Sequence, residues 1–376
     1  MKIPYNKPFV VGKELYYIAQ AVMNGQLSGD GPFTKRCHTW FEKNLNSKKA
    51  LLTHSCTSAL EMAAILCDIQ PGDEIIMPSF TFVSTANAFI LRGGVPVFID
   101  IREDTLNLDE RIIESAITPK TKAIVAVHYA GVGCEMDHIL SLARKYNLFV
   151  IEDAAQGLLS KYKDKFLGTI GDLGCLSFHE TKNVISGEGG ALLINNEKMI
   201  ERAEIIREKG TNRSKYFRGE IDKYTWVDIG SSFLPGELIA AFLFAQLENS
   251  EKITEARRYL FHLYFEHLQP LEKKGVIRLP IFDQESPPNG HIFYVIAHSI
   301  NERTRLIEHL KKHDIMAVFH YVPLHSSPAG KRFGKTCGNL KNTDVLSDGL
   351  LRLPLFFGMT DESVLRVVRA IKDFYS

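Results

Sequence analysis

Two stretches of the sequence decide the fold: Leu148-Phe149-Val150-Ile151-Glu152-Asp153-Ala154-Ala155-Gln156 and Cys175-Leu176-Ser177-Phe178-His179-Glu180-Thr181-Lys182. Each contains a short apolar run, typical of a strand that is buried on both faces. Each run then gives way to polar residues that can carry chemistry. Because parallel sheets bind ligands outside the carboxyl ends of their strands, the two stretches predict a functional site at that edge.

The surrounding sequence repeats this alternation of buried strands and helices. Strands are expected at residues 74–78, 95–99, 123–128 and 191–194, and helices between them at 58–66, 85–91 and 139–145. Continuous apolar runs that alternate with helices are typical of a mostly parallel sheet covered on both faces. The sequence therefore predicts an α/β fold around such a sheet.

The pattern changes after Gly236. A long helix is expected from Glu237 to Lys252, and charged helical sequence continues to about residue 274. Strand-like residues 292–297 and 316–321 then alternate with helical residues 303–313 and 362–375. We expect a large domain at residues 1–250, whose N-terminal segment can pack on a smaller α+β domain at residues 251–376.

Composition excludes several classes of protein. The chain has 376 residues, 45% of them hydrophobic and 24% charged, with a net charge of +1, which is unlike a disordered or disulfide-rich chain. A near-neutral chain has no overall field that attracts nucleic acid or anionic membranes, so we expect neither as a partner. Without a signal peptide or a CxxC pair, we expect a cytoplasmic protein with no metal site.

Lys182 and Asp153 are the first candidate catalytic residues. Lys182 lies between a buried strand and the turn Ser186-Gly187-Glu188-Gly189-Gly190. Partial desolvation there lowers the pKa of the lysine and makes its amine a nucleophile for Schiff-base chemistry. The alternative is a solvated loop lysine. Asp153 follows an apolar strand, where a buried carboxylate needs a cationic partner, although it could instead cap the next helix.

Two further motifs complete a chemical set. Thr53-His54-Ser55-Cys56-Thr57-Ser58 precedes a helix, whose free N–H groups can hold a phosphate even if Glu61 also completes an ordinary capping box. Phe80 and Phe82 follow the strand at 74–78, where a ring could stack on a flat cofactor or simply join the core. A lysine, a carboxylate, a phosphate cradle and a ring are together what pyridoxal phosphate needs.

Several ordered motifs resemble one family over nearly the whole chain. They are the stretches at residues 55–63, 78–88, 152–156 and 177–182, together with His320-Tyr321-Val322-Pro323-Leu324-His325 and Leu353-Pro354-Leu355-Phe356. These stretches resemble the DegT/DnrJ/EryC1/StrS family of sugar aminotransferases. The resemblance implies a pyridoxal-phosphate-dependent transferase of fold type I, like aspartate aminotransferase, with a mostly parallel central sheet and a smaller C-terminal α+β domain.

The same resemblance implies how the cofactor ring would be held. Lys182 would form a Schiff base with the cofactor and then shuttle the proton between the amino donor and the cofactor. Asp153 would pair with the ring nitrogen and keep the ring an electron sink. Phe82 would stack on the ring, and Gln156 would hydrogen-bond on the side of its phenolic oxygen.

It also implies the phosphate and substrate contacts. The backbone N–H groups of Thr57 and Ser58 and the hydroxyl of Ser177 would bind the phosphate. Tyr321 and His325 would line the substrate side of the pocket.

One segment departs from the family pattern. Many members read Gly-x-Asn-Tyr-Arg-Met here, and their Asn reaches the phosphate in the neighbouring subunit. In this chain Gly230-Ser231-Ser232-Phe233-Leu234-Pro235 puts Ser232 at the Asn position, and a serine can still donate one hydrogen bond. Family members are homodimers with shared active sites, so a homodimer is expected here. Arg213 and Lys209 are candidates for binding a nucleotide diphosphate, and the alternative for both is a solvated loop charge.

The substrates follow from the resemblance alone. We expect L-glutamate as amino donor and a nucleotide-linked keto sugar as acceptor, dTDP-4-keto-6-deoxyglucose, giving dTDP-4-amino-4,6-dideoxygalactose. A different dTDP- or UDP-keto-sugar stays open, either a 3-keto substrate or a 4-amino-4,6-dideoxyglucose product. Lys182 argues against the dehydratase branch of the family, which typically has His at this position. A pyridoxal-phosphate-binding regulator would need a DNA-binding module, and the sequence shows none. A hydride-transfer enzyme would need a complete glycine fingerprint, and the one at Gly131-Val132-Gly133 is incomplete.

Overall fold

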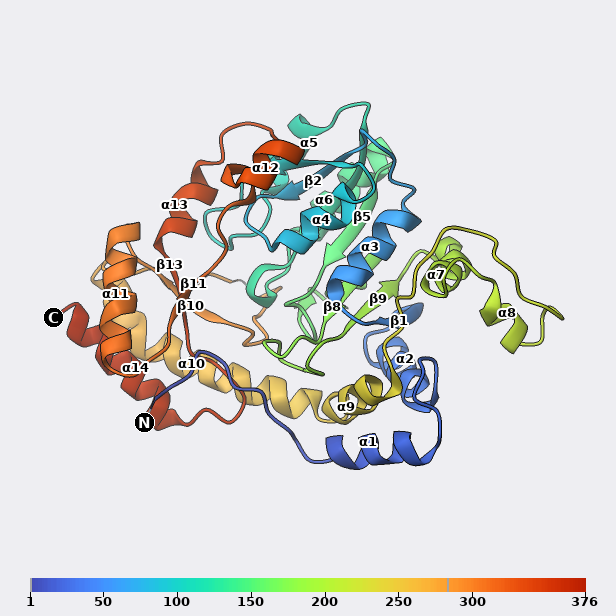
Figure 1. The fold of residues 1–376 in the computed structure, drawn as a ribbon. Helices are drawn as coiled ribbons and strands as arrows, with labels where there is room; N and C mark the ends of the chain where they lie inside the picture. The colour runs from blue at the N-terminus through green and yellow to red at the C-terminus, as the bar shows by residue number, and fades with distance from the viewer. Residues whose placement is uncertain (1, 283) are drawn as a thin grey trace.

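The computed structural model describes residues 2–282 and 284–376. In these residues the centre is an eight-stranded sheet with the order β1-β9-β8-β5-β4-β2-β3-β12 (Figure 1). Its strands are β1 Lys49–Thr53, β2 Glu74–Pro78, β3 Val95–Ile99, β4 Thr121–Val127, β5 Phe149–Asp153, β8 Leu173–Ser177, β9 Gly190–Ile194 and β12 Lys335–Thr336. Strand β9 runs antiparallel to β1 and β8, and the other neighbouring pairs are parallel. The mostly parallel sheet predicted from the sequence is confirmed.

Both faces of the sheet are buried, which explains its continuous apolar strands. In β4, Ala123 and Val125 point into one hydrophobic core, while Ile124 and Ala126 point into another on the opposite face. Side chains alternate along a strand, so a strand between two cores has no solvent-facing position. The strand sequences therefore show no polar alternation.

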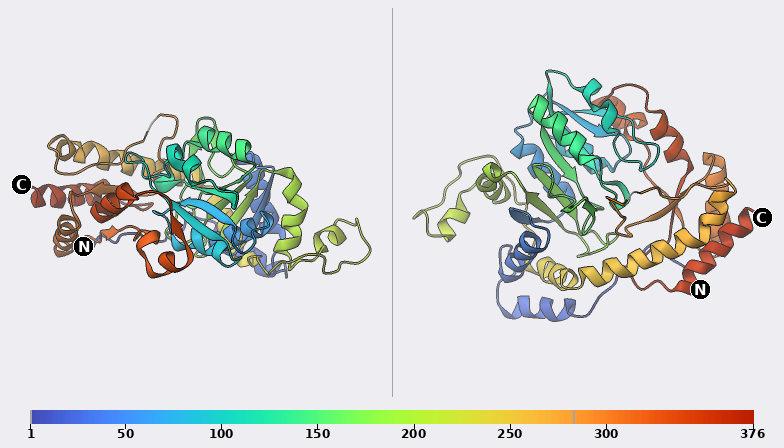
Figure 2. Two further views of the ribbon diagram at one scale, coloured as in Figure 1. Left: turned by 90° about the horizontal axis from the view of Figure 1, so that it is seen from above. Right: turned by 180° about the vertical axis from the view of Figure 1, so that it is seen from behind.

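Helices cover the two faces separately (Figures 1 and 2). One face packs against α3 Cys56–Leu66, α4 Val83–Ile90 and α7 Ile200–Arg207. The other is covered by α2 Pro32–Asn44, α6 Met136–Tyr146 and α9 Glu237–Leu247, and α1 Glu14–Met23 packs on the outside of α9. A short helix, α5 Ile113–Ala116, and a small hairpin of β6 Lys161–Tyr162 and β7 Lys165–Phe166 lie between the main elements.

The long helix expected from Glu237 to Lys252 and on to about 274 is wrong in one respect. Two helices occupy this stretch, α9 and α10 Ser250–Lys273. Asn249 separates them with φ −116° and ψ 12°, and its side-chain amide donates to the carbonyl of Ala245. A short amide side chain that hydrogen-bonds to nearby backbone competes with the helix ladder, which accounts for the break.

The C-terminal part of the chain forms a second, smaller core. It contains a three-stranded sheet, β10-β13-β11, and the elements are β10 Phe293–Ile296, α11 Ile300–Lys312, β11 Val318–Phe319, α12 Pro328–Phe333, α13 Lys341–Gly349, β13 Leu350–Leu353 and α14 Asp361–Phe374. The side chain of Ile3 is buried in this core, and Ile3 pairs with Ile315 in a parallel bridge. The N-terminal segment thus lies against the C-terminal part.

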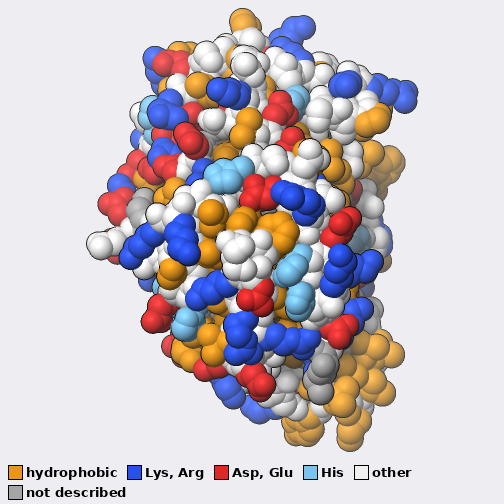
Figure 3. Space-filling model, turned by 90° about the vertical axis from the view of Figure 1, so that its left-hand side faces the viewer, with side chains coloured by type: hydrophobic (Ala, Val, Ile, Leu, Met, Phe, Trp, Pro, Cys, Tyr) orange, Lys and Arg blue, Asp and Glu red, His pale blue; other side chains and the backbone are white. Residues whose placement is uncertain are grey.

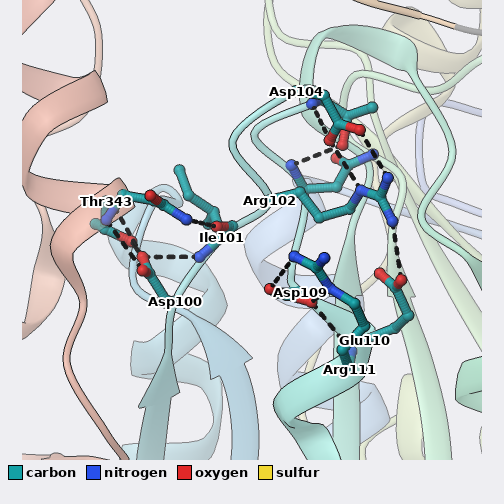
Figure 4. Close-up of polar contacts among 11 residues, drawn as sticks. Asp100, Ile101, Arg102, Asp104, Asp109, Glu110, Arg111 and Thr343 are labelled. Carbon is teal, nitrogen blue, oxygen red and sulfur yellow. Dashed lines mark hydrogen bonds and ion pairs between the residues drawn. The ribbon is translucent and has the colours of Figure 1, made fainter.

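A loop after β3 ties the C-terminal part to the large sheet (Figure 4). The Asp100 carboxylate accepts hydrogen bonds from the backbone N–H groups of Asn342 and Thr343 and from the Thr343 hydroxyl. Nearby, Arg102 pairs with Asp104 and Glu110 at 2.6 and 2.8 Å. Because β12 also joins the large sheet, the chain crosses back after residue 250, and the domain division at that position stays a prediction.

One segment projects away from the body of the molecule. We call residues 208–232 the arm; Glu208 pairs with Ser232 at its base and Thr211 with Trp226 further out. It carries α8 Arg213–Phe217 and extends beyond α7 (Figure 1). Large apolar side chains on it are exposed: Tyr216, Phe217, Tyr224, Trp226, Val227 and Ile229.

The surface seen from the C-terminal side mixes both signs of charge. Figure 3 shows Lys and Arg interspersed with Asp and Glu, without one dominant patch of either sign on this face. Within the described residues, none of the helices combines the length and apolar character needed to cross a bilayer.

Candidate functional site

Asp153 lies at the carboxyl end of β5 and is buried, with 6% of its surface exposed. Its Oδ2 accepts a hydrogen bond from the Thr85 hydroxyl at 2.7 Å, and its Oδ1 accepts one from the N–H of Ala155 at 3.2 Å. The preceding Glu152 is anchored elsewhere, since it accepts from the N–H groups of Gly168 and Gly171. Of the two adjacent acids, Asp153 is the one left to face a ligand.

Lys182 lies in the loop between β8 and β9, where its own N–H donates to the carbonyl of His179. Burial lowers the pKa of its ammonium group, and the nearby charge of Asp153 opposes that shift. Among the described residues, no group forms a hydrogen bond or ion pair with the side chain of Lys182. A partly desolvated amine without a hydrogen-bonded partner is well suited to attack a carbonyl carbon.

The start of α3 is where the sequence predicts a phosphate cradle. Ser55 is the N-cap, and its side chain accepts from the N–H of Ser58 at 3.1 Å. The Thr57 hydroxyl bonds to that of Ser84 at 2.7 Å, which joins the first turns of α3 and α4. A side chain at Gly190 would collide with the backbone of Ser55, so glycine is what lets β9 lie close under this helix end.

An aromatic group flanks the same edge of the sheet. Phe82, at the N-cap of α4, is 56% exposed, and its ring centroid lies 6.3 Å from that of Tyr321. The Tyr321 hydroxyl accepts a hydrogen bond from Gln156 Nε2 at 2.9 Å. Burial raises the pKa of Tyr321, so this phenol stays neutral. Tyr321 also has φ +31°, a strained conformation typical of functional sites.

A small cavity brings several of the predicted residues together. Gln156, Ser177 and Lys182 line it, along with Asn183 and His291. Ser177 ends β8 and is buried. The structure therefore gathers Asp153, Lys182, Gln156 and Ser177 at the carboxyl edge of β5 and β8, where parallel sheets bind ligands.

The remaining predicted residues lie further from Lys182. The Ser232 carbonyl accepts from His54 Nε2 at 3.1 Å, which places it beside the α3 cradle, with its side chain exposed. His325 bonds to Ser79 at 2.7 Å and lies 3.4 Å from Asp344. Arg213 lies on the arm, 5.0 Å from the ring of Phe217, and within one chain the structure does not bring it to Lys182.

Thr85 contacts Asp153, although no local pattern in the sequence singles it out. It falls in the first turn of α4, where it reads as an ordinary polar residue at a helix start. Its hydroxyl also bonds to that of Thr81 at 2.8 Å, which leaves its own proton for Asp153. The one sequence signal for Thr85 is its place in the family-like stretch at residues 78–88, three residues after Phe82.

These residues fit pyridoxal phosphate. They offer an amine, a buried carboxylate, an exposed ring, and a helix start whose Thr57 N–H has no backbone or side-chain acceptor among the described residues. Such a helix start suits a phosphate. Lys182 and Asp153 would hold the two ends of the reacting ring system, and α3 with Ser177 would hold the phosphate.

Known proteins are similar to this chain over most of its length. The uncharacterised protein MJ1066 of Methanocaldococcus jannaschii is 36% identical over 92% of this chain and 91% of its own. The spore coat polysaccharide biosynthesis protein SpsC of Bacillus subtilis is 32% identical over 99% and 96%. GDP-perosamine synthase of Escherichia coli O157:H7 is 29% identical over 100% and 99%.

Solved structures show the same fold. The aminotransferase TlmJ from Streptoalloteichus hindustanus superimposes with a TM-score of 0.90 at 26% identity, over 99% of this chain and 98% of that one. DesV of S. venezuelae, solved in complex with a ketimine intermediate, gives 0.88 at 27% identity over 99% and 98%. The putative sugar aminotransferase Spr1654 from Streptococcus pneumoniae, in its PLP form, gives 0.90 at 25% identity over 100% and 98%.

The sequence matches one family of enzymes over residues 10–372. That family, the fold and the set of site residues together confirm the expected fold type I and the expected cofactor. The chain belongs to the DegT/DnrJ/EryC1/StrS aminotransferase family, and it is an aminotransferase with pyridoxal phosphate as its cofactor.

Proposed function

We propose that the protein transfers the amino group of L-glutamate to C4 of dTDP-4-keto-6-deoxyglucose, giving dTDP-4-amino-4,6-dideoxygalactose and 2-oxoglutarate. The coarser statement, an aminotransferase of nucleotide-linked sugars, rests on family membership and on relatives such as GDP-perosamine synthase. The observation that carries the proposal is the placement of Lys182 beside Asp153 at the carboxyl edge of the sheet.

The choice of sugar rests on sequence resemblance. Glu208-Lys209-Gly210-Thr211-Asn212-Arg213-Ser214 and Ile229-Gly230-Ser231-Ser232 resemble the dTDP-4-amino-4,6-dideoxygalactose transaminase of enterobacterial common antigen synthesis. Both stretches belong to the arm. The proposal therefore places sugar specificity near the arm, and it places the protein in polysaccharide biosynthesis in the cytoplasm.

Pyridoxal phosphate supplies an aldehyde that exchanges with amines and a ring that withdraws electrons. Lys182 Nζ takes the proton from the Cα of the amino donor and returns a proton to the new amine-bearing carbon of the sugar. Asp153, held in place by hydrogen bonds from Thr85 and Ala155, would pair with the ring nitrogen and hold a proton there. Phe82 covers one side of the ring and excludes water there.

Other predicted residues hold the ends of the ligands. The N–H group of Thr57 and the Ser177 hydroxyl bind the phosphate. The N–H of Ser58, which donates to Ser55 Oγ in this structure, would share its proton with the phosphate. Gln156, fixed by Tyr321, orients the phenolic oxygen of the ring. Tyr321 and His325 line the sugar side of the pocket.

A homodimer completes the proposal. The exposed apolar residues of the arm, such as Phe217 at 68% and Trp226 at 79%, suit burial against a second copy of the chain. In that arrangement Ser232 and Arg213 serve the site of the partner subunit, where Ser232 donates to the cofactor phosphate and Arg213 meets the nucleotide diphosphate.

A product assay tests the proposal. The enzyme is incubated with L-glutamate and a panel of dTDP- and UDP-linked 3-keto and 4-keto sugars, and NMR assigns the position and configuration of the new amine. The expected result is an axial C4 amine of galacto configuration on the dTDP-linked sugar. Preference for a 3-keto sugar, or an amine of gluco configuration, would refute the assignment.

A further inference from the structure

Asn183, the residue after Lys182, is held at both ends of its side chain by one segment from the later part of the chain. We call residues 289–291 the clamp. The side chain of Asn183 is buried, with 3% of the residue exposed. Its amide nitrogen donates to the carbonyl of Asn289 at 3.0 Å, and its Oδ1 lies 3.0 Å from Nδ1 of His291. The clamp thus binds both polar ends of this amide.

The proton in the second of these bonds belongs to His291. Because the amide nitrogen of Asn183 is directed at Asn289, its oxygen faces the imidazole, and this oxygen can only accept. Nδ1 of His291 is therefore the donor. Burial, together with the charges of Lys182 and Arg257, lowers the pKa of the ring well below its ordinary value of 6.5. The neutral ring holds Asn183 without placing a second cation beside the amine of Lys182.

The clamp also holds the loop that follows β5. The side-chain amide of Asn289 donates to the carbonyl groups of Gln156 and Leu158 at 2.9 and 3.0 Å. Its oxygen accepts from the backbone N–H of His291 at 3.0 Å, which fixes the clamp internally. One short segment therefore binds both loops that carry predicted cofactor contacts, the loop with Gln156 and the loop with Lys182.

Arg257 on α10 anchors the clamp from the other side. Its side chain is buried, and it donates to the carbonyl of Gly290 at 3.0 Å and to that of His291 at 2.6 Å. Gly290 has φ +67°, and a side chain there would collide with the backbone of Arg257, so glycine is required for this approach. Through Arg257, the elements of the smaller core determine where the imidazole of His291 lies.

We propose that His291 is a positioning residue for Lys182: its Nδ1–H fixes Asn183 and so holds the adjacent lysine in reach of the cofactor aldehyde. This inference rests on the proposed role of Lys182. His291 and Lys182 line the same small cavity, and Asn183 is joined to Lys182 by one peptide bond, so a shift of the amide side chain is passed directly to the lysine. A displacement of about 1 Å at a reacting group can lower a rate about 10²-fold.

Two forms of the cofactor separate positioning from folding. Pyridoxal phosphate condenses with the amine of Lys182 and releases one water, whereas pyridoxamine phosphate has no aldehyde and forms no bond to the lysine. Stopped-flow absorbance measures the rate of condensation in the apoenzyme, and calorimetry measures the affinity for pyridoxamine phosphate. For His291→Phe, which keeps a ring and removes both nitrogens, we expect condensation about 10- to 100-fold slower and an affinity within about twofold of the wild type.

His291→Asn is the conservative variant. Its side-chain N–H can take the place of Nδ1–H, so we expect the condensation rate to return to within about threefold of the wild type. His38→Phe is the matched control. His38 is another imidazole whose pKa is lowered by burial, and its Nε2 accepts from the N–H of Leu52 at 2.8 Å, but it lies on α2 and makes no contact with the clamp. Both measured quantities should stay at their wild-type values in this control.

Three outcomes would overturn the inference: a His291→Phe variant that condenses as fast as the wild type, a His291→Asn variant as slow as His291→Phe, or an equal loss of condensation rate and of affinity for pyridoxamine phosphate. If His291→Phe does not fold, Asn183→Ala decides, because it removes the acceptor of the same bond and should slow condensation to the same extent. A wild type that forms no Schiff base would refute the proposed role of Lys182 as well. The measurements use neither amino donor nor sugar, so an error in the assigned sugar does not affect them.

Discussion

The hydroxyl of Thr85 donates a 2.7 Å hydrogen bond to Oδ2 of Asp153, joining the first turn of α4 to the carboxyl end of β5. This bond fixes the direction of the carboxylate. We expect Thr85→Val, which keeps the shape and removes the donor, to lower kcat about tenfold and to weaken cofactor binding, as for loss of one hydrogen bond to a charged acceptor. Dialysis followed by fluorescence titration with pyridoxal phosphate measures the affinity.

Thr81→Val is the control for this prediction. The Thr81 hydroxyl bonds to that of Thr85 and makes no bond to Asp153, so its loss is expected to have a clearly smaller effect. Equal losses in the two variants would mean that packing at the start of α4, rather than the bond to Asp153, matters.

Replacement of Lys182 tests the central residue. Lys182→Ala removes the amine through which both half-reactions pass, and we expect activity to fall by at least about 10³-fold. Absorbance of the bound Schiff base should also disappear from the purified protein. Lys165→Ala, at an exposed lysine on β7, is expected to keep both. A Lys182→Ala protein with unchanged absorbance would refute the cofactor assignment.

Asp153 and Lys182, the two residues proposed to be catalytic, could be singled out from the sequence because they follow buried strands. Asp153 and Lys182 each come after a short apolar run, and parallel topology then places them at one edge of the sheet. Thr85 could not be assigned, since its role depends on α4 lying beside β5, which no local pattern records. The two-residue strand β12, Lys335–Thr336, has no apolar run at all and is exposed, so only tertiary contact reveals it.

The reactivity of Lys182 should depend on pH in a defined direction. Burial lowers the pKa of this amine below the ordinary value of 10.5, so a larger fraction is neutral at any given pH. Because only the neutral amine attacks the aldehyde, the rate at which the apoenzyme is reconstituted by pyridoxal phosphate should rise with pH and reach half its maximum below 10.5.

Nα-acetyl-lysine is the reference for this measurement. It reacts with the same aldehyde, so titration of pyridoxal phosphate itself affects both curves equally. Its midpoint is expected at about 10.4. A reconstitution midpoint at or above that of the free amine would contradict the pKa shift.

Glu237 offers a test of the fold. It is 1% exposed, and its carboxylate accepts hydrogen bonds from the N–H groups of Phe33 and Thr34 at 2.8 and 2.9 Å. Glu237, the first residue of α9, thereby caps the N-terminal end of α2. Glu237→Ala leaves these N–H groups buried and unpaired, and we expect the free energy of unfolding to fall by about 3 kcal/mol. Urea titration followed by circular dichroism measures it.

The control is Glu197→Ala. Glu197 is 68% exposed and pairs with Lys48 at 3.1 Å, and surface pairs of this kind contribute less than about 1 kcal/mol. A similar loss of stability in both variants would argue against the capping role of Glu237.

Substitutions in the arm test the proposed homodimer. Phe217 and Trp226 expose large apolar surfaces on a segment that extends away from its own chain (Figure 1). Burial of such side chains between two copies favours association. We expect Phe217→Ser with Trp226→Ser to raise the dimer dissociation constant at least about tenfold, measured by sedimentation equilibrium. Activity per subunit should fall with dissociation, because the proposal assigns Ser232 and Arg213 to the partner's site.

Ile300→Ser, at an exposed residue at the start of α11, should leave association unchanged. A double variant that stays dimeric at the concentrations where the wild type does would exclude the arm as the interface.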